Sequence, residues 1–574
     1  MSKLELELYD LWNKNATEDD DLIKELEEIK GNQKEIKERF YQDLAFGTAG
    51  LRGVLGAGTN RMNIYMIRKT TQAFANYLNN NHKNPSVAIS YDSRIKSNIF
   101  AKEAACVLAG NNIKAYIYKQ LMPVPCLSYA VRYLKCDAGI MVTASHNPAK
   151  YNGYKVYGND GCQLTESSAD KIYEISSKID TFHGIKKINF QDGLKKGIIN
   201  YISDEVEQKY LDCVKACSVH PEILSESDFK VVYTPLNGAG NKPVRKMFSQ
   251  MGVKSVYIVK EQENPDGNFP TCPTPNPEIR EALTLGLRDC ETIKPDILVA
   301  TDPDCDRMGI AVPDKEGNYV LITGNEIGAL LLEYICSERL ALGTLPKKPI
   351  AVKTIVSSDI VRKIADNYGV ELINVLTGFK YIGEQIAILE KKGEENRFIL
   401  GFEESYGYLM GSYVRDKDAV VATMLICEMT AFYRKQGKSL LDALNDIYVK
   451  YGTYLNIVDS YVFEGMEGMD KMKKLMSNIR SKFPKMIGGK KVIKYLDYLS
   501  SENLDIDNGN KTKISLPKSN VIEFRLEDNM SVIIRPSGTE PKIKVYYTLT
   551  GDTFKKAKEN ENIIKNDFKK YIEI

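Results

Sequence analysis

The strongest constraint on the fold is a pattern that occurs three times, a short apolar run that leads directly into a polar loop. The three runs begin at Asp137, Asp296 and Arg397, and they lead into Thr143-Ala-Ser-His-Asn-Pro, Thr301-Asp-Pro-Asp-Cys-Asp and Gly401-Phe-Glu-Glu-Ser. Helical patterns alternate with such runs, which is typical of βαβ units and mainly parallel sheets. Because ligands gather at the carboxyl ends of strands in such sheets, we expect the three loops to converge on one cleft.

The length of 574 residues favours several domains. We predict an α/β protein with three similar α/β domains, each with a mixed, mainly parallel sheet, and a C-terminal α+β domain, arranged around one central cleft. The predicted ranges are 1–210, 211–322, 323–455 and 456–574. In the last range, 521–526 and 531–535 resemble paired strands, whereas 486–491 and 503–510 resemble loops. Residues 18–40 have the spacing of one amphipathic helix.

The charge and cysteine content narrow the functional classes. With 78 Lys and Arg against 76 Asp and Glu, the net charge of +2 gives no reason to expect nucleic acid or an anionic membrane as a partner. No apolar run is long enough to span a bilayer, and the first residues include several acids, so we expect a cytoplasmic protein. The eleven cysteines form no C-x-x-C pair, which favours reduced thiols.

Asp302, Asp304 and Asp306 occupy alternate positions after the second apolar run. In an extended loop their carboxylates can converge on one hard cation, and Mg²⁺ is the natural candidate. An EF-hand is excluded, because Pro313 stands where that loop needs its final Glu. A haloacid-dehalogenase phosphatase also has two aspartates after a strand, but it has a small or β-branched residue at the position of Asp306.

Ser145 and His146 lie side by side in the loop after the first run. The G-x-S-x-G elbow of α/β-hydrolases is absent, and adjacent side chains project differently, so we do not expect His146 to activate Ser145 as in a serine hydrolase. A serine oxygen can instead carry a phosphoryl group, whose charge a nearby cation would offset. Beside the aspartate loop, phosphoryl transfer is the better interpretation.

Three further stretches have side chains suited to a sugar phosphate. Arg535-Pro-Ser-Gly-Thr-Glu-Pro has the composition of an anion-binding loop, with a guanidinium group, two hydroxyls and a flexible glycine. No Walker A motif occurs, so nucleotide hydrolysis loses support. Glu403 and Glu404 offer acceptors for sugar hydroxyls, Thr377-Gly-Phe-Lys380 offers a cation on a turn, and the glycine-rich loop from Phe46 to Gly53 contains Arg52.

Together these motifs resemble the α-D-phosphohexomutase superfamily, and most of all its branch of bacterial phosphoglucomutases similar to phosphoglucomutase-2 and phosphopentomutase. Five motifs match in order between residues 46 and 547. The resemblance implies Ser145 as the phosphoserine, and Mg²⁺ held by Asp302, Asp304, Asp306 and a phosphoserine oxygen. The remaining implied site residues are Glu403, Glu404 and Ser405 for sugar hydroxyls; Arg535, Ser537, Gly538 and Thr539 for the phosphate that is not reacting; and Arg52, His146, Lys155, Arg307, Thr377, Gly378 and Lys380 for phosphate or substrate contacts.

The reaction that the resemblance implies is the interconversion of glucose 1-phosphate and glucose 6-phosphate, with glucose 1,6-bisphosphate as intermediate and activator. Pentose phosphates or mannose phosphates are alternative substrates with the same mechanism. A metal-dependent phosphatase and a non-catalytic sugar-phosphate-binding regulator remain rivals from other classes. Two positions depart from the family pattern: Phe402 replaces a common Gly, which affects the expected sugar preference, and Cys305 replaces a common Ala or Gly between two metal ligands.

Overall fold

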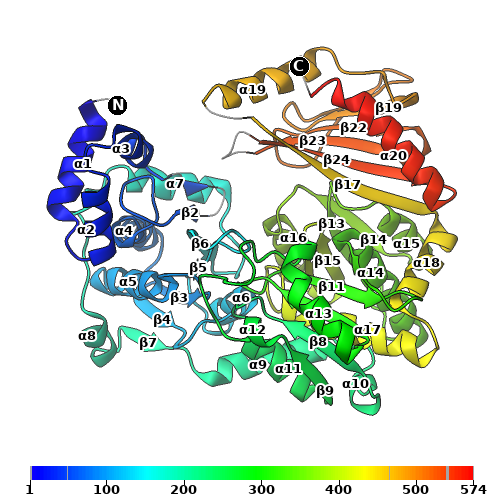
Figure 1. Ribbon diagram of the computed structural model, residues 1–574, viewed down its shortest axis with the longest axis horizontal. Helices are drawn as coiled ribbons and strands as arrows, with labels where there is room; N and C mark the ends of the chain where they lie inside the picture. The colour runs from blue at the N-terminus through cyan, green and yellow to red at the C-terminus, as the bar shows by residue number, and fades with distance from the viewer. Residues whose placement is uncertain (1–2, 45, 48–49, 464–465, 538–541, 573–574) are drawn as a thin grey trace. The chain divides into compact units, whose positions relative to one another are not determined.

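The structure is a computed structural model that describes residues 3–44, 46–47, 50–463, 466–537 and 542–572 (Figure 1). The chain forms two compact units. The first unit contains Met1–Ile322, Gly383–Phe398 and Ser405–Gln436, and the second contains Thr323–Ile382, Ile399–Glu404 and Gly437–Ile574. Within the described residues, no helix combines the length and the apolar character needed to cross a membrane.

The first unit begins with a seven-stranded sheet of order β1-β2-β6-β5-β3-β4-β7. Its strands are β1 (Phe46–Gly47), β2 (Gly50–Val54), β6 (Tyr151–Gly158), β5 (Ala138–Val142), β3 (Ser86–Tyr91), β4 (Lys114–Ile117) and β7 (Ile199–Tyr201). Strands β5, β3, β4 and β7 run parallel, and β1, β2 and β6 add antiparallel pairs at one edge. The sheet is therefore mixed and mainly parallel at its centre.

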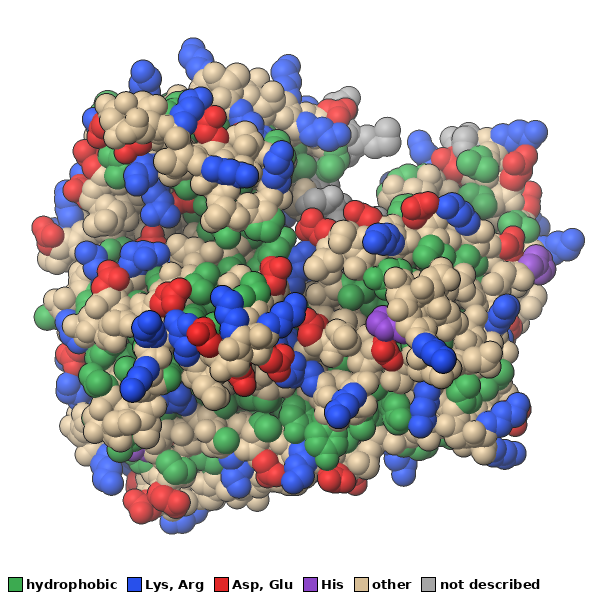
Figure 2. Space-filling model, turned by 180° about the vertical axis from the view of Figure 1, so that it is seen from behind, with side chains coloured by type: hydrophobic (Ala, Val, Ile, Leu, Met, Phe, Trp, Pro, Cys, Tyr) green, Lys and Arg blue, Asp and Glu red, His purple; other side chains and the backbone are tan. Residues whose placement is uncertain are grey.

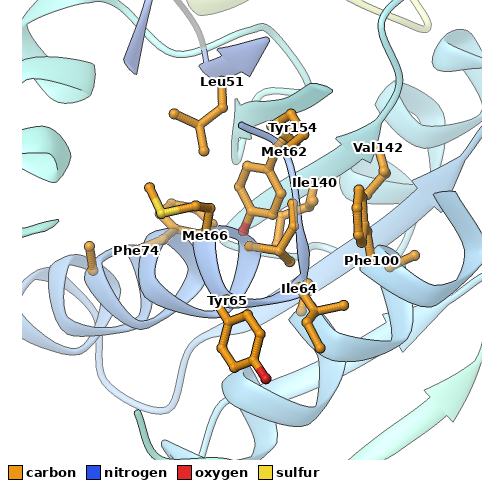
Figure 3. Close-up of a cluster of buried hydrophobic side chains, with 14 of the residues drawn as sticks. Leu51, Met62, Ile64, Tyr65, Met66, Phe74, Phe100, Ile140, Val142 and Tyr154 are labelled. Carbon is orange, nitrogen blue, oxygen red and sulfur yellow. The ribbon is translucent and has the colours of Figure 1, made fainter. Parts of the chain in front are cut away.

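Helices cover both faces of this sheet. Helices α4 (Ile64–Asn81) and α5 (Ser97–Gly110) contribute Met66, Phe74 and Phe100 to a core that also contains Ile140 and Val142 of β5 (Figure 3). Successive side chains of a strand alternate between the two faces of the sheet, so the residue between Ile140 and Val142 points to the other face. On that face, α6 (Val124–Tyr133) packs against β3 and β5. The run at 138–142 is thus a strand buried on both faces, and for this reason it reads as continuously apolar.

The N-terminal segment differs from the predicted single helix over residues 18–40. It contains α1 (Lys3–Asn15), α2 (Asp20–Glu28) and α3 (Gln33–Phe40). The break falls at Gly31, which has a φ of 80°, and at Asn32, whose side chain accepts a hydrogen bond from the Glu35 N–H at the start of α3. Helical spacing continues across this turn, so the prediction missed a break that the Gly-Asn pair encodes.

The second sheet of the first unit has the order β12-β11-β10-β8-β9. Its strands are β12 (Tyr319–Ile322), β11 (Met308–Pro313), β10 (Ile297–Thr301), β8 (Lys230–Thr234) and β9 (Ser255–Ile258), of which β10, β8 and β9 are parallel. Helix α13 (Thr284–Ile293) packs against β8 and β10. Helix α17 (Ala419–Lys435), from much later in the chain, packs against β10 and β11.

The second unit holds a third α/β sheet and an antiparallel sheet. In the third sheet, β13 (Ile350–Thr354) lies between β14 (Glu371–Val375), which is parallel to it, and β15 (Phe398–Glu403). The last sheet has the order β17-β24-β23-β22-β19-β20-β21, and its described pairs are antiparallel. Its strands are β17 (Thr453–Val462), β24 (Lys542–Gly551), β23 (Ser531–Pro536), β22 (Ile522–Leu526), β19 (Lys490–Asp497), β20 (Glu502–Asp505) and β21 (Lys511–Lys513).

Helices α19 (Met466–Ser481) and α20 (Phe554–Lys569) complete the core of this last domain. The two segments predicted as loops, 486–491 and 503–510, are only partly loops. Residues 488–489 and 506–510 lie in turns or loops, as predicted, whereas the other residues belong to β18 (Met486–Ile487), β19 and β20, which pair with their neighbours. The remaining α-helices and strand are α7 (Glu166–Ser176), α8 (Phe190–Lys195), α9 (Asp204–Ala216), α10 (Ile223–Glu226), α11 (Asn241–Gln250), α12 (Lys260–Glu263), α14 (Gly324–Ala341), α15 (Ile360–Tyr368), α16 (Lys380–Lys391), β16 (Gly407–Leu409) and α18 (Leu440–Tyr451).

The predicted fold class is confirmed: three α/β regions precede an antiparallel sheet with its own helices. The domain boundaries and the common cleft stay predictions. On the face shown in Figure 2, acidic and basic side chains are interspersed, as expected for a chain with almost balanced charge.

Candidate functional site

The aspartate loop connects β10 to β11 and is tightly closed. The N–H groups of Asp306 and Arg307 donate to Asp302 Oδ1 at 3.1 and 3.0 Å. Cys305, at the apex, has a left-handed φ of 52°. The loop is also fixed from outside, because the Val124 N–H donates to the Asp304 carbonyl and the Ala419 N–H, at the start of α17, donates to the Cys305 carbonyl. These bonds fix the backbone of the loop at several points.

The aspartate side chains form a cluster suited to a metal ion. One oxygen from each of Asp302, Asp304 and Asp306 lies within 4.8 Å of the others, and all three residues are buried. Asp304 Oδ1 and Asp306 Oδ1 are buried and accept no hydrogen bond from any described residue. Burial and the two neighbouring carboxylates raise the pKa of Asp302 well above its usual value. A bound divalent cation would satisfy the two oxygens and offset this repulsion, so the residues fit a hard metal ion.

The serine loop brings Ser145 to this cluster. Ser145 follows β5, is buried, and has a left-handed φ of 52°. Its Oγ donates to Asp302 Oδ2 at 2.9 Å, and its N–H donates to Thr143 Oγ1 at 2.8 Å. Ser145 Oγ also lies 3.1 Å from His146 Nδ1. The expectation that the adjacent Ser145 and His146 side chains diverge is therefore wrong, because the left-handed backbone turns them toward each other.

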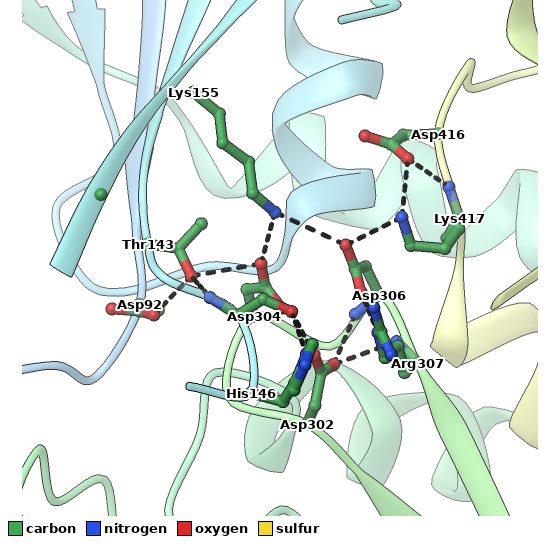
Figure 4. A network of polar contacts seen from close by, with 12 residues as sticks. Asp92, Thr143, His146, Lys155, Asp302, Asp304, Asp306, Arg307, Asp416 and Lys417 are labelled. Atoms are coloured by element: carbon green, nitrogen blue, oxygen red, sulfur yellow. Dashed lines mark hydrogen bonds and ion pairs between the residues drawn. The ribbon is translucent and has the colours of Figure 1, made fainter. Parts of the chain in front are cut away.

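Two lysines lie beside the cluster (Figure 4). Lys155 on β6 donates to Asp304 Oδ2 at 2.8 Å and lies 3.6 Å from Asp306 Oδ2. Lys417, just before α17, lies 3.3 Å from the same Asp306 oxygen. Burial alone would raise the pKa of Asp306, but Lys417, Lys155 and Arg307 hold it below its usual range. Lys417 was not among the site residues predicted from the sequence. The one feature that could have indicated it is the charged run Arg-Asp-Lys-Asp at 415–418.

The other predicted residues of the first unit surround the serine loop. Arg307 forms an ion pair with Glu278. Arg52 on β2 donates to Asn147 Oδ1 at 3.3 Å. Burial, together with Arg307 and Arg52, lowers the pKa of His146 well below its usual value, which favours the neutral imidazole. Ser405 also belongs to the first unit.

The second unit contains the glutamates and the predicted phosphate loop. Glu403 is buried at the end of β15, and Glu404 Oε2 accepts a hydrogen bond from Thr354 Oγ1 at 3.2 Å. Burial and Glu403 raise the pKa of Glu404 to about 7. Arg535 lies at the end of β23, followed by Ser537, and Arg535 lowers the pKa of Tyr546, which burial and Glu404 raise.

The predicted turn before α16 also belongs to the second unit. Gly378 has a φ of 118°, Thr377 precedes it, and Lys380 begins α16 with its Nζ 5.0 Å from the ring centre of Tyr381. Gly538 and Thr539 lie outside the described residues.

A buried serine hydroxyl beside a hard-cation cluster and two ammonium groups is suited to phosphoryl transfer, because each of these groups can stabilise phosphate charge. Comparison with known families agrees with this class. Models of phosphoglucomutase/phosphomannomutase α/β/α domains I, II and III match residues 43–183, 208–317 and 323–451. The chain therefore belongs to the phosphoglucomutase/phosphomannomutase family.

Curated relatives extend this similarity over nearly the whole chain. A phosphoglucomutase from Staphylococcus haemolyticus is 37% identical over 524 residues, covering 91% of this chain and 93% of its own. One from Staphylococcus epidermidis is 38% identical over 538 residues, covering 93% and 96%. The fold also resembles the open form of parafusin, a phosphoglucomutase from Paramecium, with a TM-score of 0.70 at 19% identity over 92% of this chain and 95% of that one.

Proposed function

We propose that this chain is a phosphoglucomutase that interconverts α-D-glucose 1-phosphate and glucose 6-phosphate through a phosphorylated Ser145. The observation that carries the proposal is the buried Ser145 hydroxyl, 2.9 Å from Asp302 in a cluster with two unsatisfied carboxylate oxygens. Its relatives at 36–38% identity are named phosphoglucomutases, which supports glucose as the sugar.

The proposed reaction has two transfers. In the first, the free hydroxyl oxygen of a sugar monophosphate attacks the phosphorus of phospho-Ser145. The bond from phosphorus to Ser145 Oγ breaks with its electron pair left on Oγ, and the sugar hydroxyl loses its proton to a base. The resulting glucose 1,6-bisphosphate reorients, and Ser145 Oγ takes the other phosphoryl group by the same steps in reverse. His146 and Lys380 are the candidates for proton transfer.

The metal ligands in this proposal are Asp302, Asp304, Asp306 and an oxygen of phospho-Ser145. Mg²⁺ bound there would neutralise the charge that develops on the transferred phosphoryl group. Lys155 and Arg307 lie at the same cluster, where they can contact a phosphoryl oxygen. The two lysine contacts to Asp306 keep this carboxylate ionised and ready to bind a cation.

The second unit supplies the sugar and distal phosphate contacts in this proposal. Glu403 and Glu404, with Ser405 of the first unit, would accept hydrogen bonds from sugar hydroxyls. The phosphate that is not reacting would be bound by Arg535, Ser537, Gly538 and Thr539. The substrate would also contact Thr377, Gly378 and Lys380, and Arg52 would face a phosphate.

The described cysteines form no disulfide, in keeping with a cytoplasmic enzyme.

The first experiment compares kcat/KM for glucose 1-phosphate, mannose 1-phosphate and ribose 1-phosphate in the presence of Mg²⁺ and glucose 1,6-bisphosphate. We expect glucose 1-phosphate to be preferred. A preference for ribose 1-phosphate would keep the mechanism and assign a phosphopentomutase. Stoichiometric phosphate release would instead favour a phosphatase, and no turnover of any sugar phosphate would favour a binding protein.

The Ser145→Ala variant tests the phosphoryl carrier. We expect it to lose at least about 10³-fold in kcat, because alanine has no side-chain oxygen to carry the group. Intact-protein mass spectrometry after incubation with glucose 1,6-bisphosphate should show one added phosphoryl group on the native protein and none on the variant. Retained turnover in Ser145→Ala would refute the phosphoserine.

A further inference from the structure

Arg94, which follows β3, has no role in the reaction proposed above, yet it lies directly under the serine loop. Its side chain is fully buried. One Nη donates to the Ser145 carbonyl at 2.5 Å and to the Asn147 carbonyl, and the other donates to the carbonyls of Pro148 and Tyr151 at 3.0 Å. A single guanidinium group therefore joins both ends of the turn that carries Ser145.

Asp92 forms an ion pair with this guanidinium and extends the network. It lies 3.3 Å from Arg94 Nε and accepts hydrogen bonds from the Ser97 hydroxyl at 2.8 Å and from Thr143 Oγ1 at 2.6 Å. Thr143 Oγ1 in turn accepts the Ser145 N–H and lies 3.1 Å from Asp304 Oδ2 (Figure 4). The serine loop, Asp92 and the aspartate loop thus share one continuous set of hydrogen bonds.

A residue of the second sheet's domain covers the other side of Arg94. The Phe269 ring centre lies 5.1 Å from Arg94 Cζ, and Phe269 is buried with a left-handed φ of 47°. Gly267 permits this approach, because a Cβ at that position would lie 2.4 Å from the Ile95 nitrogen. The aromatic face attracts the cation and excludes water from its bonds to the serine loop.

We infer that Arg94, held by Asp92 and covered by Phe269, is the positioning residue that keeps Ser145 in its left-handed conformation beside Asp302. A serine with positive φ is unfavourable by itself and persists only when its surroundings enforce it. Four carbonyl contacts from one rigid, planar group provide that enforcement. The functional part of this inference rests on the phosphoserine mechanism proposed above.

The Arg94→Lys variant tests the inference, because lysine keeps the charge but lacks the planar fork. The first readout is hydrogen exchange of residues 143–151 in the protein without substrate, where we expect at least a tenfold faster exchange. The second is turnover, where we expect kcat to fall about 10–100-fold with KM nearly unchanged, since a misplacement of about 1 Å has an effect of this size. Hydrolysis of phospho-Ser145 per mutase turnover should rise, because the loop no longer aligns the phosphoryl group.

Arg68→Lys is the matched control. Arg68 is similarly buried in the same unit and pairs with Glu18 and Glu103, away from the serine loop. We expect the Arg68→Lys variant to lose stability as Arg94→Lys does. Its hydrogen exchange at residues 143–151 and its ratio of phosphoserine hydrolysis to mutase turnover should stay native. If Arg94→Lys does not fold, Phe269→Leu, which keeps the carbonyl contacts but removes the ring, should show smaller changes in the same direction.

The inference is overturned if exchange at 143–151 in Arg94→Lys matches that in Arg68→Lys, or if exchange rises while kcat and the hydrolysis ratio stay as in that control. If Phe269→Leu has to be used instead, native hydrogen exchange at 143–151 together with native hydrolysis of phospho-Ser145 would also overturn the inference. Failure of the proposed function has a different signature, namely no turnover and no serine phosphorylation in the native protein. The exchange measurement needs no substrate and decides the positioning role even then.

Discussion

Asp306 Oδ2 lies near the ammonium groups of Lys155 and Lys417, whereas its Oδ1 accepts no hydrogen bond from any described residue and lies 3.9 Å from Arg307 Nε, so Oδ1 can still bind a cation. Replacing Asp306 with Asn removes a charged ligand and leaves two lysines facing each other. We expect the affinity for Mn²⁺, used as a spectroscopic probe of the metal site, to fall by at least about 10–100-fold, the size of effect that even supporting groups have at metal sites. Electron paramagnetic resonance titration measures this change.

The control for this variant is Asp296→Asn. Asp296 is partly buried just before β10 and accepts hydrogen bonds from Lys230 N and Arg434 Nη1, so it is a second carboxylate with cationic and backbone partners that lies outside the cluster. Native Mn²⁺ affinity in Asp306→Asn, or equal losses in both variants, would show that the aspartate cluster is not the metal site.

Glu404 makes stability depend on pH, because burial and Glu403 raise its pKa to about 7 from its ordinary value of 4.5. Between these values the folded state binds more protons than the unfolded state, so this group's contribution is fully present below pH 4.5 and is lost as pH rises through 7. The slope is at most about 1.4 kcal/mol per pH unit. Glu404→Gln should remove this contribution, so its thermal midpoint should fall less than that of the native protein between pH 5 and pH 7.5. Parallel pH profiles in both proteins would contradict the assignment.

Site residues that belong to a recognisable motif were predicted from the sequence. Residues that reach the site only because the folded chain brings them there were missed. Ser145 and Asp302 were predicted to be neighbours because both follow apolar strands, and they share a hydrogen bond. Lys417 and Arg94 were missed, because nothing in a single lysine or arginine shows that the chain will return it to the serine loop. Nearby aspartates were the only signal: Lys417 stands between two aspartates before a helix, and Arg94 follows an aspartate by two residues after a strand.

Among the elements, β6 connects the edge strands to the serine loop through a close backbone contact at Gly153. A Cβ there would lie 2.4 Å from the Thr143 carbonyl oxygen, immediately before the serine turn. Gly153→Ala should therefore displace the serine loop, lower kcat at least tenfold and destabilise the protein by about 1–3 kcal/mol, as overpacking does elsewhere. Kinetic assays and thermal unfolding test this directly.

Gly158 provides the comparison on the same strand. The nearest atom to a Cβ at Gly158 would be Asp160 Oδ1, at 3.2 Å, and this side chain can move; the Leu164 side chain and the Cys162 carbonyl oxygen, at 3.5 and 3.9 Å, are at ordinary contact distances. Gly158→Ala should keep native kcat. If both variants have native turnover, the close packing of β6 against the serine loop does not matter for the reaction.

Strands were predictable from the sequence where a short apolar run stood between polar segments. The strands at 138–142 and 297–301 are buried along their whole length and therefore appeared as continuous apolar runs. In contrast, β19 and β20 contain many charged and polar side chains and lie beside Gly and Asn, so composition indicated loops. These segments form strands because they pair with neighbouring strands of the sheet. A short stretch of sequence taken by itself does not contain that information.

At the scale of the whole molecule, the first unit is closed by a segment that follows much of the second unit in the chain. Residues 405–436 return to it, so that α17 covers β10 and β11 and Lys417 reaches Asp306. A fragment of residues 1–322 lacks this cover. We expect it to show no cooperative thermal transition by circular dichroism and no Mn²⁺ binding, whereas residues 1–436 should retain more of both. A fragment 1–322 that melts cooperatively and binds Mn²⁺ like the full chain would contradict this dependence.

The left-handed backbone of Ser145 also limits what evolution can place there. Threonine carries the same hydroxyl, but its branched Cβ makes a φ near 52° much less favourable. Exchange of serine for threonine is harmless at many phosphorylation sites. Here it would keep the hydroxyl group but disfavour the backbone conformation that the turn requires. The identity of the phosphoryl carrier is thus selected by the shape of the main chain as much as by the reactivity of an oxygen atom.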